Sequence, residues 1–369
     1  MIIESIDVYH VEMPYREPWV TSFGSSFGTG SVVVKLTTNE AIGWGEAAPC
    51  RSALYSPEYT AGAYELVSTI IAPRLLGMDI NSGEQLQEYL SAQKGNPFAK
   101  SVLDVAWWDA YAKSRSSPLW KVIGGKNSTV SVGADLTIRE NQEETLDDVY
   151  EVLQNGFNRI KLKFGRNSSV SLLNEIRRRY PDLSFHIDCN NCFTLDDLDV
   201  LLEVDKVGLA MIEQPLAYDD LVDHAKLQTQ IATPICLDES IDSIAKAKKA
   251  IELKSCQWIN IKVGRVGGIT PAISIHDLCQ EHDMPCWIGS MLESNLGQGA
   301  SLAMATLPNN KYPSDIFPSD RFYTEDLGFP DIQLSGVSTV TAPDRPGVGY
   351  EPKVGMLEKL TINHKRLTL

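Results

Sequence analysis

From about Ser128 onward, short apolar runs alternate with longer amphipathic stretches. The apolar runs predict β-strands near 130–135, 159–164, 184–188, 208–213, 234–238, 258–262 and 285–289. The amphipathic stretches between them predict helices, for example at Glu143–Gln154, Leu172–Tyr180 and Ser243–Leu253. Alternating strands and helices predict a parallel sheet with right-handed crossover connections. Seven or eight such units over about 200 residues predict a closed α/β barrel rather than an open sheet.

The first 125 residues have a different pattern. Ile2 to Met13 alternates in strand fashion, Gly30 to Leu36 is rich in β-branched residues, and helical patterns follow near 57–75 and 96–115. After Leu334 the chain returns to short strands and turns. We therefore predict three parts: an α+β domain at 1–125, the barrel at 126–334, and a segment at 335–369 that packs back on the first domain.

Composition narrows the class of protein. The chain has 369 residues, 43% of them hydrophobic, and a formal net charge of −15, which argues against nucleic acid or an anionic membrane as partner. The first residues combine acids with apolar residues and lack a basic region, so we expect no signal peptide and a cytoplasmic location. Cys189-x-x-Cys192 invites a zinc or redox interpretation, but no second pair stands at zinc spacing, and reduced, buried thiols are the simpler reading.

Three acidic residues stand at an even interval. Asp188, Glu213 and Asp238 are twenty-five residues apart, and each closes a predicted strand. In a β/α barrel the carboxyl ends of the strands share one rim, so these side chains should converge there. Carboxylates so close repel one another unless a cation compensates, and oxygen-only ligands suit Mg²⁺ or Mn²⁺. The alternative is three separately solvated loop acids.

Lysines flank these acids. Lys161 and Lys163 are two apart on one predicted strand, so both point to the same face. The apolar residues beside them would face the helices, which favours lysines inside the barrel over an outward, solvated pair. Lys262 closes the sixth strand, across the barrel from the second. A divalent ion about 6 Å away would oppose an ammonium charge by roughly 5 kcal/mol and so lower a lysine pKa. A lysine would then serve as a general base near neutral pH.

Motifs along nearly the whole chain resemble the enolase superfamily, muconate-lactonising subgroup. Within it, the chain looks like the o-succinylbenzoate synthase / N-succinylamino acid racemase family. Besides the acids and lysines, the motifs are Thr21–Gly24, Gly43–Glu46, Leu54–Tyr59, Arg159–Lys163, Ile212–Pro215, Thr233–Ser240, Asn260–Gly268, Gly289–Glu293 and Ser319–Tyr323.

The resemblance implies a modified TIM barrel, (β/α)₇β, under an α+β capping domain formed by both chain ends. It implies Mg²⁺, with Mn²⁺ as an alternative, held by the three acids, a small-molecule carboxylate substrate, and a homo-oligomer. The implied reaction is syn-dehydration of 2-succinyl-6-hydroxy-2,4-cyclohexadiene-1-carboxylate to o-succinylbenzoate, a menaquinone precursor. Lys163 would remove the α-proton and return it to the departing hydroxide, Lys262 would steady the enolate as a cation, and Lys161 completes the catalytic group. The alternative is racemisation of N-succinylamino acids, with both lysines exchanging protons.

The resemblance also implies a substrate pocket. Capping-loop and pocket positions are Trp19, Phe23, Tyr55, Ser290, Met291 and Phe322, and the site is tuned by Asn190, Glu239 and Arg265. Arg265 would lower the pKa of Lys262 and accompany racemase activity, although a solvated loop arginine is the alternative. His186 is interpreted as a packed, hydrogen-bonded histidine rather than a ligand.

The chain departs from the family pattern at a few positions. Trp19 replaces the common Phe, and Trp287 to Ser290 and Ser314 to Pro318 also differ, which leaves the side-chain preference open. Dipeptide epimerases carry Asp-x-Asp on strand eight, but Asp315 and Asp320 are five apart. Acid-sugar dehydratases need a histidine where Gly289-Ser290 stands, and the loop motifs disfavour muconate cycloisomerase. A catalytically silent barrel would have lost one of the six charged groups, and all are present.

Overall fold

Seven parallel strands form one curled sheet at the centre of the molecule. The computed structural model describes all residues 1–369. Neighbouring strands follow chain order in the sheet: β5 (Ala134–Leu136), β6 (Arg159–Lys163), β7 (Ser184–Asp188), β8 (Ile212–Glu213), β9 (Ile235–Leu237), β10 (Trp258–Ile261) and β11 (Cys286–Ile288). An eighth segment closes the ring, because the Asp315 N–H donates to the Ile288 carbonyl at 2.9 Å and the Gly133 N–H to the Ser314 carbonyl at 3.1 Å. The predicted modified TIM barrel is confirmed.

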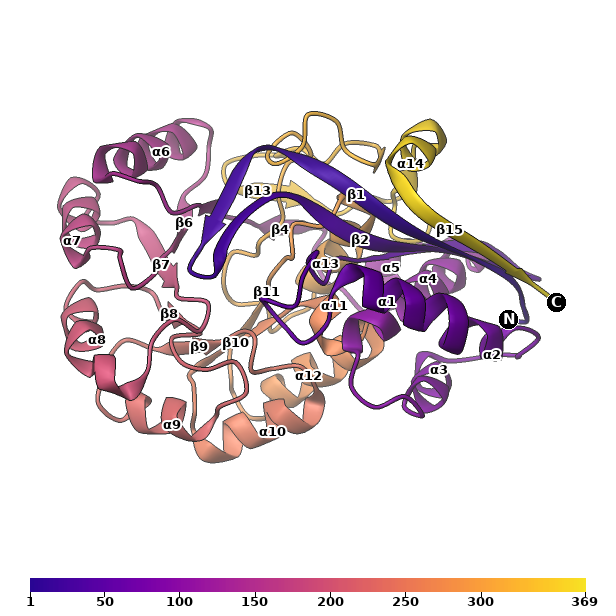
Figure 1. Ribbon diagram of the computed structural model, residues 1–369, viewed down its shortest axis with the longest axis horizontal. Helices are drawn as coiled ribbons and strands as arrows, with labels where there is room; N and C mark the ends of the chain where they lie inside the picture. The colour runs from indigo at the N-terminus through magenta and orange to yellow at the C-terminus, as the bar shows by residue number, and fades with distance from the viewer.

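Helices surround this barrel (Figure 1). They are α6 (Gln142–Gln154), α7 (Val170–Arg179), the 3₁₀ turn Leu195–Asp197 with α8 (Leu198–Asp205), α9 (Val222–Gln228), α10 (Ile244–Leu253), α11 (Val263–Val266), α12 (Ile269–Glu281) and α13 (Asn295–Ala305). None is long and apolar enough to cross a membrane, nor is any other helix of the protein.

The predicted strand at 208–213 is regular only at β8. Gly208, with φ of +78°, ends the preceding turn. The Ala210 N–H still donates to the Phe185 carbonyl of β7 at 2.9 Å, and Leu209 and Met211 are buried.

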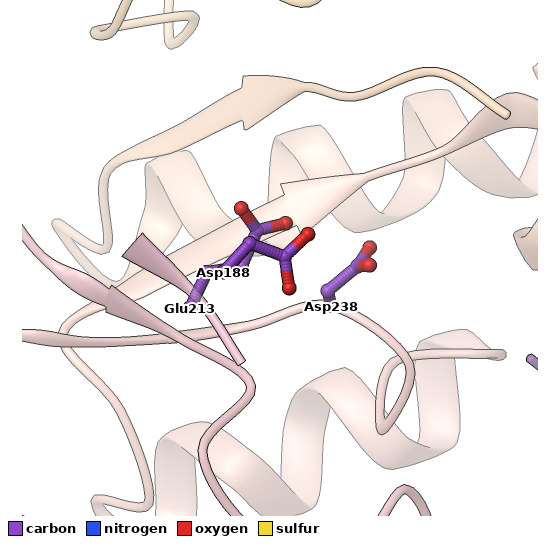
Figure 2. A group of neighbouring side chains, drawn as sticks. All are labelled: Asp188, Glu213 and Asp238. Carbon is purple, nitrogen blue, oxygen red and sulfur yellow. The ribbon is translucent and has the colours of Figure 1, made fainter. Parts of the chain in front are cut away.

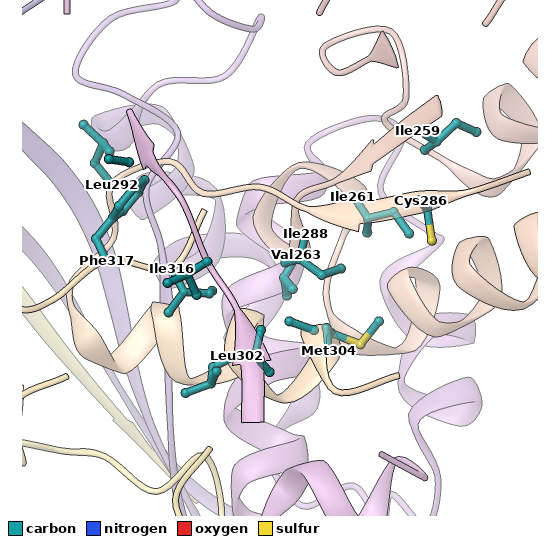
Figure 3. Packing of buried hydrophobic residues seen from close by; sticks show 14 of the residues in the cluster. Ile259, Ile261, Val263, Cys286, Ile288, Leu292, Leu302, Met304, Ile316 and Phe317 are labelled. Atoms are coloured by element: carbon teal, nitrogen blue, oxygen red, sulfur yellow. The ribbon is translucent and has the colours of Figure 1, made fainter. Parts of the chain in front are cut away.

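The barrel core lies between the strands and the helices. Figure 3 shows Ile261 of β10 and Ile288 of β11 above Leu302 and Met304 of α13, with Ile259 farther along β10. All five side chains are at most 1% exposed. Burying apolar surface of this kind supplies roughly 25 cal/mol per Å². The packed core holds the barrel strands in place, and the strands in turn fix the positions of the side chains at their C-terminal ends.

A four-stranded antiparallel sheet forms the second domain. Its order is β15 (Thr361–Thr368), β1 (Ile3–Thr21), β2 (Gly24–Thr38) and β3 (Ile42–Ala47). The end of the chain thus joins the N-terminal sheet. Other tail elements are β12 (Gly328–Phe329), β13 (Thr339–Thr341), β14 (Glu351–Pro352) and α14 (Val354–Leu360), of which β13 pairs instead with β4 (Thr129–Ser131). The domain boundaries at 125 and 334 stay a prediction.

Helix α4 (Pro97–Ser114) packs directly on β3. A Cβ on Gly45 would lie 2.2 Å from the Val102 carbonyl oxygen, and one on Gly43 would lie 2.0 Å from that of Ala106. Only glycine lets the helix backbone approach so closely. The remaining capping helices are α1 (Thr60–Leu66), α2 (Ala72–Leu75), α3 (Gly83–Leu90) and α5 (Leu119–Val122), with a π-helical segment at Val67–Ile71 between the first two.

Buried carboxylates of the capping domain bind the N-terminal ends of barrel helices. Asp104 of α4 accepts hydrogen bonds from the backbone N–H groups of Ile269 and Thr270 at 2.7 and 3.2 Å, at the start of α12. Glu46 of β3 accepts from the Gly297 N–H at 3.0 Å, at the start of α13. Each acid satisfies donors that the helix cannot pair internally. These contacts fix the capping domain against the barrel.

The β1–β2 hairpin extends over the barrel (Figure 1). Near its tip, the Val20 N–H donates to Thr137 Oγ1 at 2.6 Å and the Ser22 hydroxyl donates to the Asn190 carbonyl at 3.1 Å. The hairpin therefore reaches the loops after β5 and β7, at the rim where the predicted site lies.

Candidate active site

Three carboxylates meet at the C-terminal rim of the barrel (Figure 2). Asp188 ends β7, Glu213 ends β8, and Asp238 directly follows β9. All three are 0% exposed, and one possible ligand atom from each lies within 4.8 Å of the others. The structure thus brings together the acids whose even spacing predicted a common rim.

The electrostatics of this cluster fit a cation. Burial raises the pKa of Glu213 to about 8, and the Asp188 carboxylate adds to the rise. Burial also disfavours the Asp238 anion, but Arg265 and Lys262 outweigh it and hold the pKa of Asp238 well below the usual range. Buried oxygen donors at this spacing suit a hard divalent ion, whose charge would relieve the repulsion.

The two lysines of β6 point into the barrel. Lys163 Nζ donates to Asp188 Oδ2 at 2.5 Å. Lys161 Nζ lies 2.9 Å from Asp135 Oδ2 and also pairs with Asp315. The Lys161 side chain is only 2% exposed, so the inward orientation predicted from the two-residue spacing is correct.

Lys262 approaches the acids from β10, four strands from β6 in the sheet and so on the opposite side of the barrel. Its Nζ donates to Asp238 Oδ2 at 2.8 Å and to Tyr55 Oη at 3.2 Å. Arg265 lies behind it, where its guanidinium donates to Asp238 Oδ1 and, at 3.0 Å, to Tyr55 Oη. Because Arg265 is 2% exposed, the alternative of a solvated loop arginine is wrong.

The protein's own charges act against the lowered lysine pKa that the sequence predicted. Burial is the largest influence and disfavours the Lys262 ammonium, yet the surrounding carboxylates, Asp238 foremost and Glu213 with it, together raise the pKa of Lys262 above its ordinary value. Arg265 does lower that pKa, as expected, but by less than Asp238 raises it. For Lys161, burial is outweighed by Asp135 and Asp315, which hold its pKa well above the usual range. Each ammonium thus has a carboxylate at hydrogen-bond distance, a partner that spacing alone did not show.

Asn190 and Glu239 border the three acids. The Asn190 backbone N–H donates to Asp188 Oδ1 at 3.0 Å, and its side-chain amide donates to Glu239 Oε1 at the same distance. Burial, with Asp238 next in effect, holds the pKa of Glu239 well above its usual range. The pair therefore connects the loop that follows Asp188 to the loop that begins at Asp238.

The capping loops contribute aromatic residues near the rim. Trp19 packs edge-to-face on Phe322 with ring centroids 5.2 Å apart. Phe23, Tyr55 and Asn190 line a cavity of about 540 Å³. Lys163 opens on another cavity, of about 990 Å³, between the hairpin tip and the loops after β5 and β6. The hairpin thus stands over the rim, as a cover for a substrate requires.

Ser290 and Met291 follow β11. The Ser290 hydroxyl donates to Glu293 Oε2 at 2.6 Å and accepts from the Leu292 N–H at 2.9 Å. Met291 is 8% exposed and packs with the core of the capping domain. Met291 therefore joins the barrel to the capping domain, whereas the Ser290 hydroxyl is engaged within its own turn.

Two family matches span most of the chain. Residues 3–124 match the mandelate racemase / muconate lactonizing enzyme N-terminal domain, and residues 144–355 match the enolase C-terminal domain-like family. The chain belongs to the enolase superfamily.

Relatives within the enolase superfamily carry two different activities. The o-succinylbenzoate synthase of Geobacillus stearothermophilus is 38% identical over 97% of this chain and 96% of its own length. The N-succinylamino acid racemase of Thermus thermophilus is 37% identical over 98% of each chain. A crystal structure of an enolase-superfamily member from Listeria innocua, 32% identical, has a TM-score of 0.95 and covers 100% of this chain and 99% of its own. The three buried acids are consistent with a divalent metal, as elsewhere in the superfamily.

In this enolase-superfamily chain, several charged and polar groups around the site were not predicted from the sequence. Asp135 and Asp315 hold Lys161, and they also pair with Arg159 at 3.3 and 2.7 Å. Asn260 donates to Glu213 Oε1 at 2.7 Å. Asp135 carried a usable signal, since it is an acid inside the first apolar run of the barrel. Arg159 carried one too, because it lies two residues before Lys161 on the same face.

Proposed function

We propose that this chain is a Mg²⁺-dependent o-succinylbenzoate synthase. It dehydrates 2-succinyl-6-hydroxy-2,4-cyclohexadiene-1-carboxylate to o-succinylbenzoate in menaquinone biosynthesis, and Mn²⁺ can replace Mg²⁺. One observation carries the proposal. Lys163 and Lys262 come from opposite strands, and each is bonded to a different acid of one buried set, at 2.5 and 2.8 Å. Two lysine side chains facing one carboxylate-lined centre suit proton removal next to a substrate carboxylate, since a bound cation would favour the neutral amine that acts as the base.

In this proposal Asp188, Glu213 and Asp238 hold the metal. When bound, the ion holds the substrate carboxylate and stabilises the negative charge that develops as the α-proton leaves. Lys163 Nζ takes that proton. As the carbon–oxygen bond breaks, Lys163 returns the proton to the departing hydroxide, which leaves as water. Lys262 stays protonated and faces the developing charge.

The remaining residues orient the substrate and exclude water. Lys161, held by Asp135 and Asp315, presents a fixed cation to the substrate carboxylate. Trp19, Phe23, Tyr55, Ser290, Met291 and Phe322 form the walls of the substrate pocket, while Asn190, Glu239 and Arg265 hold the metal-binding acids and Lys262 in place. A closed cover strengthens every electrostatic interaction inside it.

Racemisation of N-succinylamino acids is the second candidate. It is supported by the buried Arg265, which shares Asp238 with Lys262 and so equips Lys262 to release a proton as well as to hold one. Lys163 and Lys262 would then exchange protons on opposite faces of the α-carbon. Similarity to the racemase of Thermus thermophilus, at 37% identity, supports the same candidate.

The structure disfavours dipeptide epimerisation. That activity needs acidic groups free to bind a substrate ammonium, but Asp315 is buried and paired with Lys161 and Arg159. An L-Ala-D/L-Glu epimerase of Bacillus subtilis is less similar to this chain, at 28% identity.

The test is direct assay of the purified protein. With Mg²⁺, it is offered the cyclohexadiene precursor and, separately, N-succinyl-phenylalanine. We expect dehydration that is lost in Lys163→Ala and kept in Lys206→Ala, which removes a lysine whose side chain is 67% exposed. Racemisation without dehydration would select the second candidate. Turnover of neither compound would overturn the proposal.

A further inference from the structure

Both carboxylate oxygens of Glu213 lie at hydrogen-bond distance from side chains of other barrel strands. Asn260 Nδ2, on β10, donates to Oε1 at 2.7 Å. On the other side, His186 Nε2, on β7, lies 3.3 Å from Oε2. A carboxylate oxygen has two lone pairs, so each oxygen keeps one free for a cation. The two contacts fix the rotation of this carboxylate and still leave a lone pair on each oxygen for a cation.

The imidazole of His186 is itself held in one orientation. Its Nδ1 lies 3.1 Å from the Tyr312 hydroxyl, and its ring packs edge-to-face against Trp287 at 5.6 Å. Glu213 must be ionised to bind a cation, and an ionised carboxylate only accepts hydrogen bonds. In that state Nε2 carries the proton toward Glu213 and Nδ1 accepts from Tyr312. His186 is 0% exposed, which prevents water from replacing this donor.

Asn260 is constrained in a similar way. A Cβ on Gly289 would lie 2.3 Å from Asn260 Oδ1, so the glycine leaves room for the amide. The Asn260 carbonyl also accepts from Arg265 at 2.6 Å. Glu213 thus sits between two donors that cannot move aside, one from each flank of the barrel interior.

We propose that His186 is a positioning residue for the metal centre: its Nε2–H holds Glu213 in the rotamer that binds the divalent ion. The inference rests on the metal-dependent function proposed above and adds a residue to it. His186 acts through Glu213 rather than as a ligand, because the acids alone form the group of potential ligand atoms within 4.8 Å of one another. Groups that orient a metal ligand typically change metal affinity by about 10–100-fold when removed.

Three substitutions separate hydrogen bonding from packing. In His186→Gln, the terminal amide nitrogen takes roughly the place of Nε2 and can still donate to Glu213. In His186→Asn, the amide is too short to reach Glu213, although the side chain stays polar. In His186→Leu, the donor is lost altogether. His276→Leu is the control, because His276 is also buried, at 2% exposed, but its ring bonds to Asp277 and the Asn309 N–H instead.

The experiment is a Mn²⁺ titration of each variant by isothermal calorimetry, without substrate, with circular dichroism to check the fold. We expect Kd for Mn²⁺ to rise about 10–100-fold in His186→Leu and His186→Asn, and to stay near the wild-type value in His186→Gln and His276→Leu. If His186→Leu does not fold, His186→Asn decides.

Several results would overturn the inference. Wild-type affinity in His186→Asn would show that the Nε2–H does not position Glu213. Equal loss in His186→Gln would mean that the imidazole acts by shape, and equal loss in His276→Leu would mean a general loosening. In each of these cases, Mn²⁺ binding by the wild-type protein would leave the proposed function standing. Only a wild-type protein that binds no Mn²⁺ would overturn the proposed function as well.

Discussion

Asp104→Asn should remove a pH dependence from the stability of this protein. Asp104 of α4 is 0% exposed, and its side chain packs against the first residues of α12. One oxygen accepts the two backbone N–H groups there, and the other accepts from the Thr270 hydroxyl and the Gln87 amide, both at 2.8 Å. Asparagine keeps the first oxygen and has nearly the same volume. The substitution therefore removes the charge and leaves the main helix cap.

The magnitude follows from the pKa of the buried carboxyl. Burial raises the pKa of Asp104 from 3.8 to about 6. The folded protein then binds a proton that the unfolded chain has released, so the free energy of unfolding falls as pH rises from about 4 to 7. A shift of this size corresponds to about 3 kcal/mol. The asparagine side chain does not titrate. Because pH 4 already lies above the unfolded pKa of 3.8, the Asp104→Asn variant should gain about 2 kcal/mol of this on wild type between pH 4 and pH 7.

Urea unfolding at pH 4, 5, 6 and 7, in EDTA, measures this difference. Asp219→Asn, at an exposed position, is the control and should run parallel to wild type. A wild-type curve that stays parallel to that of Asp104→Asn across this range would refute the reasoning. It would mean that the helix terminus keeps Asp104 ionised despite its burial.

Three further outcomes are expected. Asp238→Asn should abolish the rise in Tm that Mg²⁺ gives wild type, while Asp242→Asn, outside the three acids, keeps it; an unchanged Mg²⁺ response would count against these ligands. Gly45→Ala places a Cβ 2.2 Å from the Val102 carbonyl oxygen and should lower the free energy of unfolding by about 1–3 kcal/mol in urea titrations. Gly355→Ala, whose Cβ meets nothing within 4 Å, should not lower the free energy of unfolding. Equal decreases in the two variants would contradict the packing argument. Arg265→Gln should reduce α-proton exchange on the Lys262 face, followed by NMR in ²H₂O, more than it reduces dehydration; equal losses would argue against Arg265 as a partner of Lys262.

Periodicity and spacing predicted much of the fold and the centre of the site. Asp188 and Asp238 could be placed because each closes an apolar run, and parallel strands bring their ends to one rim. Lys161 could be oriented because strand side chains alternate. These are local rules, and they need no knowledge of how distant segments meet.

Other features depend on contacts across the closed barrel. Asp315 drew notice only for its distance from Asp320, but ring closure places it beside Lys161 and Arg159. The same contacts explain why the neighbouring carboxylates hold the pKa of Lys161 above its usual range. A charged partner on the segment that closes the barrel cannot be predicted from periodicity, because periodicity describes one strand at a time.

The pairing of β1 with β15 has a consequence for synthesis. Asp7 Oδ1 and His364 Nε2, 3.0 Å apart, are separated by 357 positions in the chain. At ribosomal rates of about 5–20 residues per second, β1 therefore exposes an unpaired edge for tens of seconds while the whole barrel emerges. Premature termination anywhere in the barrel would release a chain whose first sheet lacks its outer neighbour. Such a chain would present the backbone N–H and C=O groups of β1 as an open edge, the kind of edge that favours edge-to-edge association.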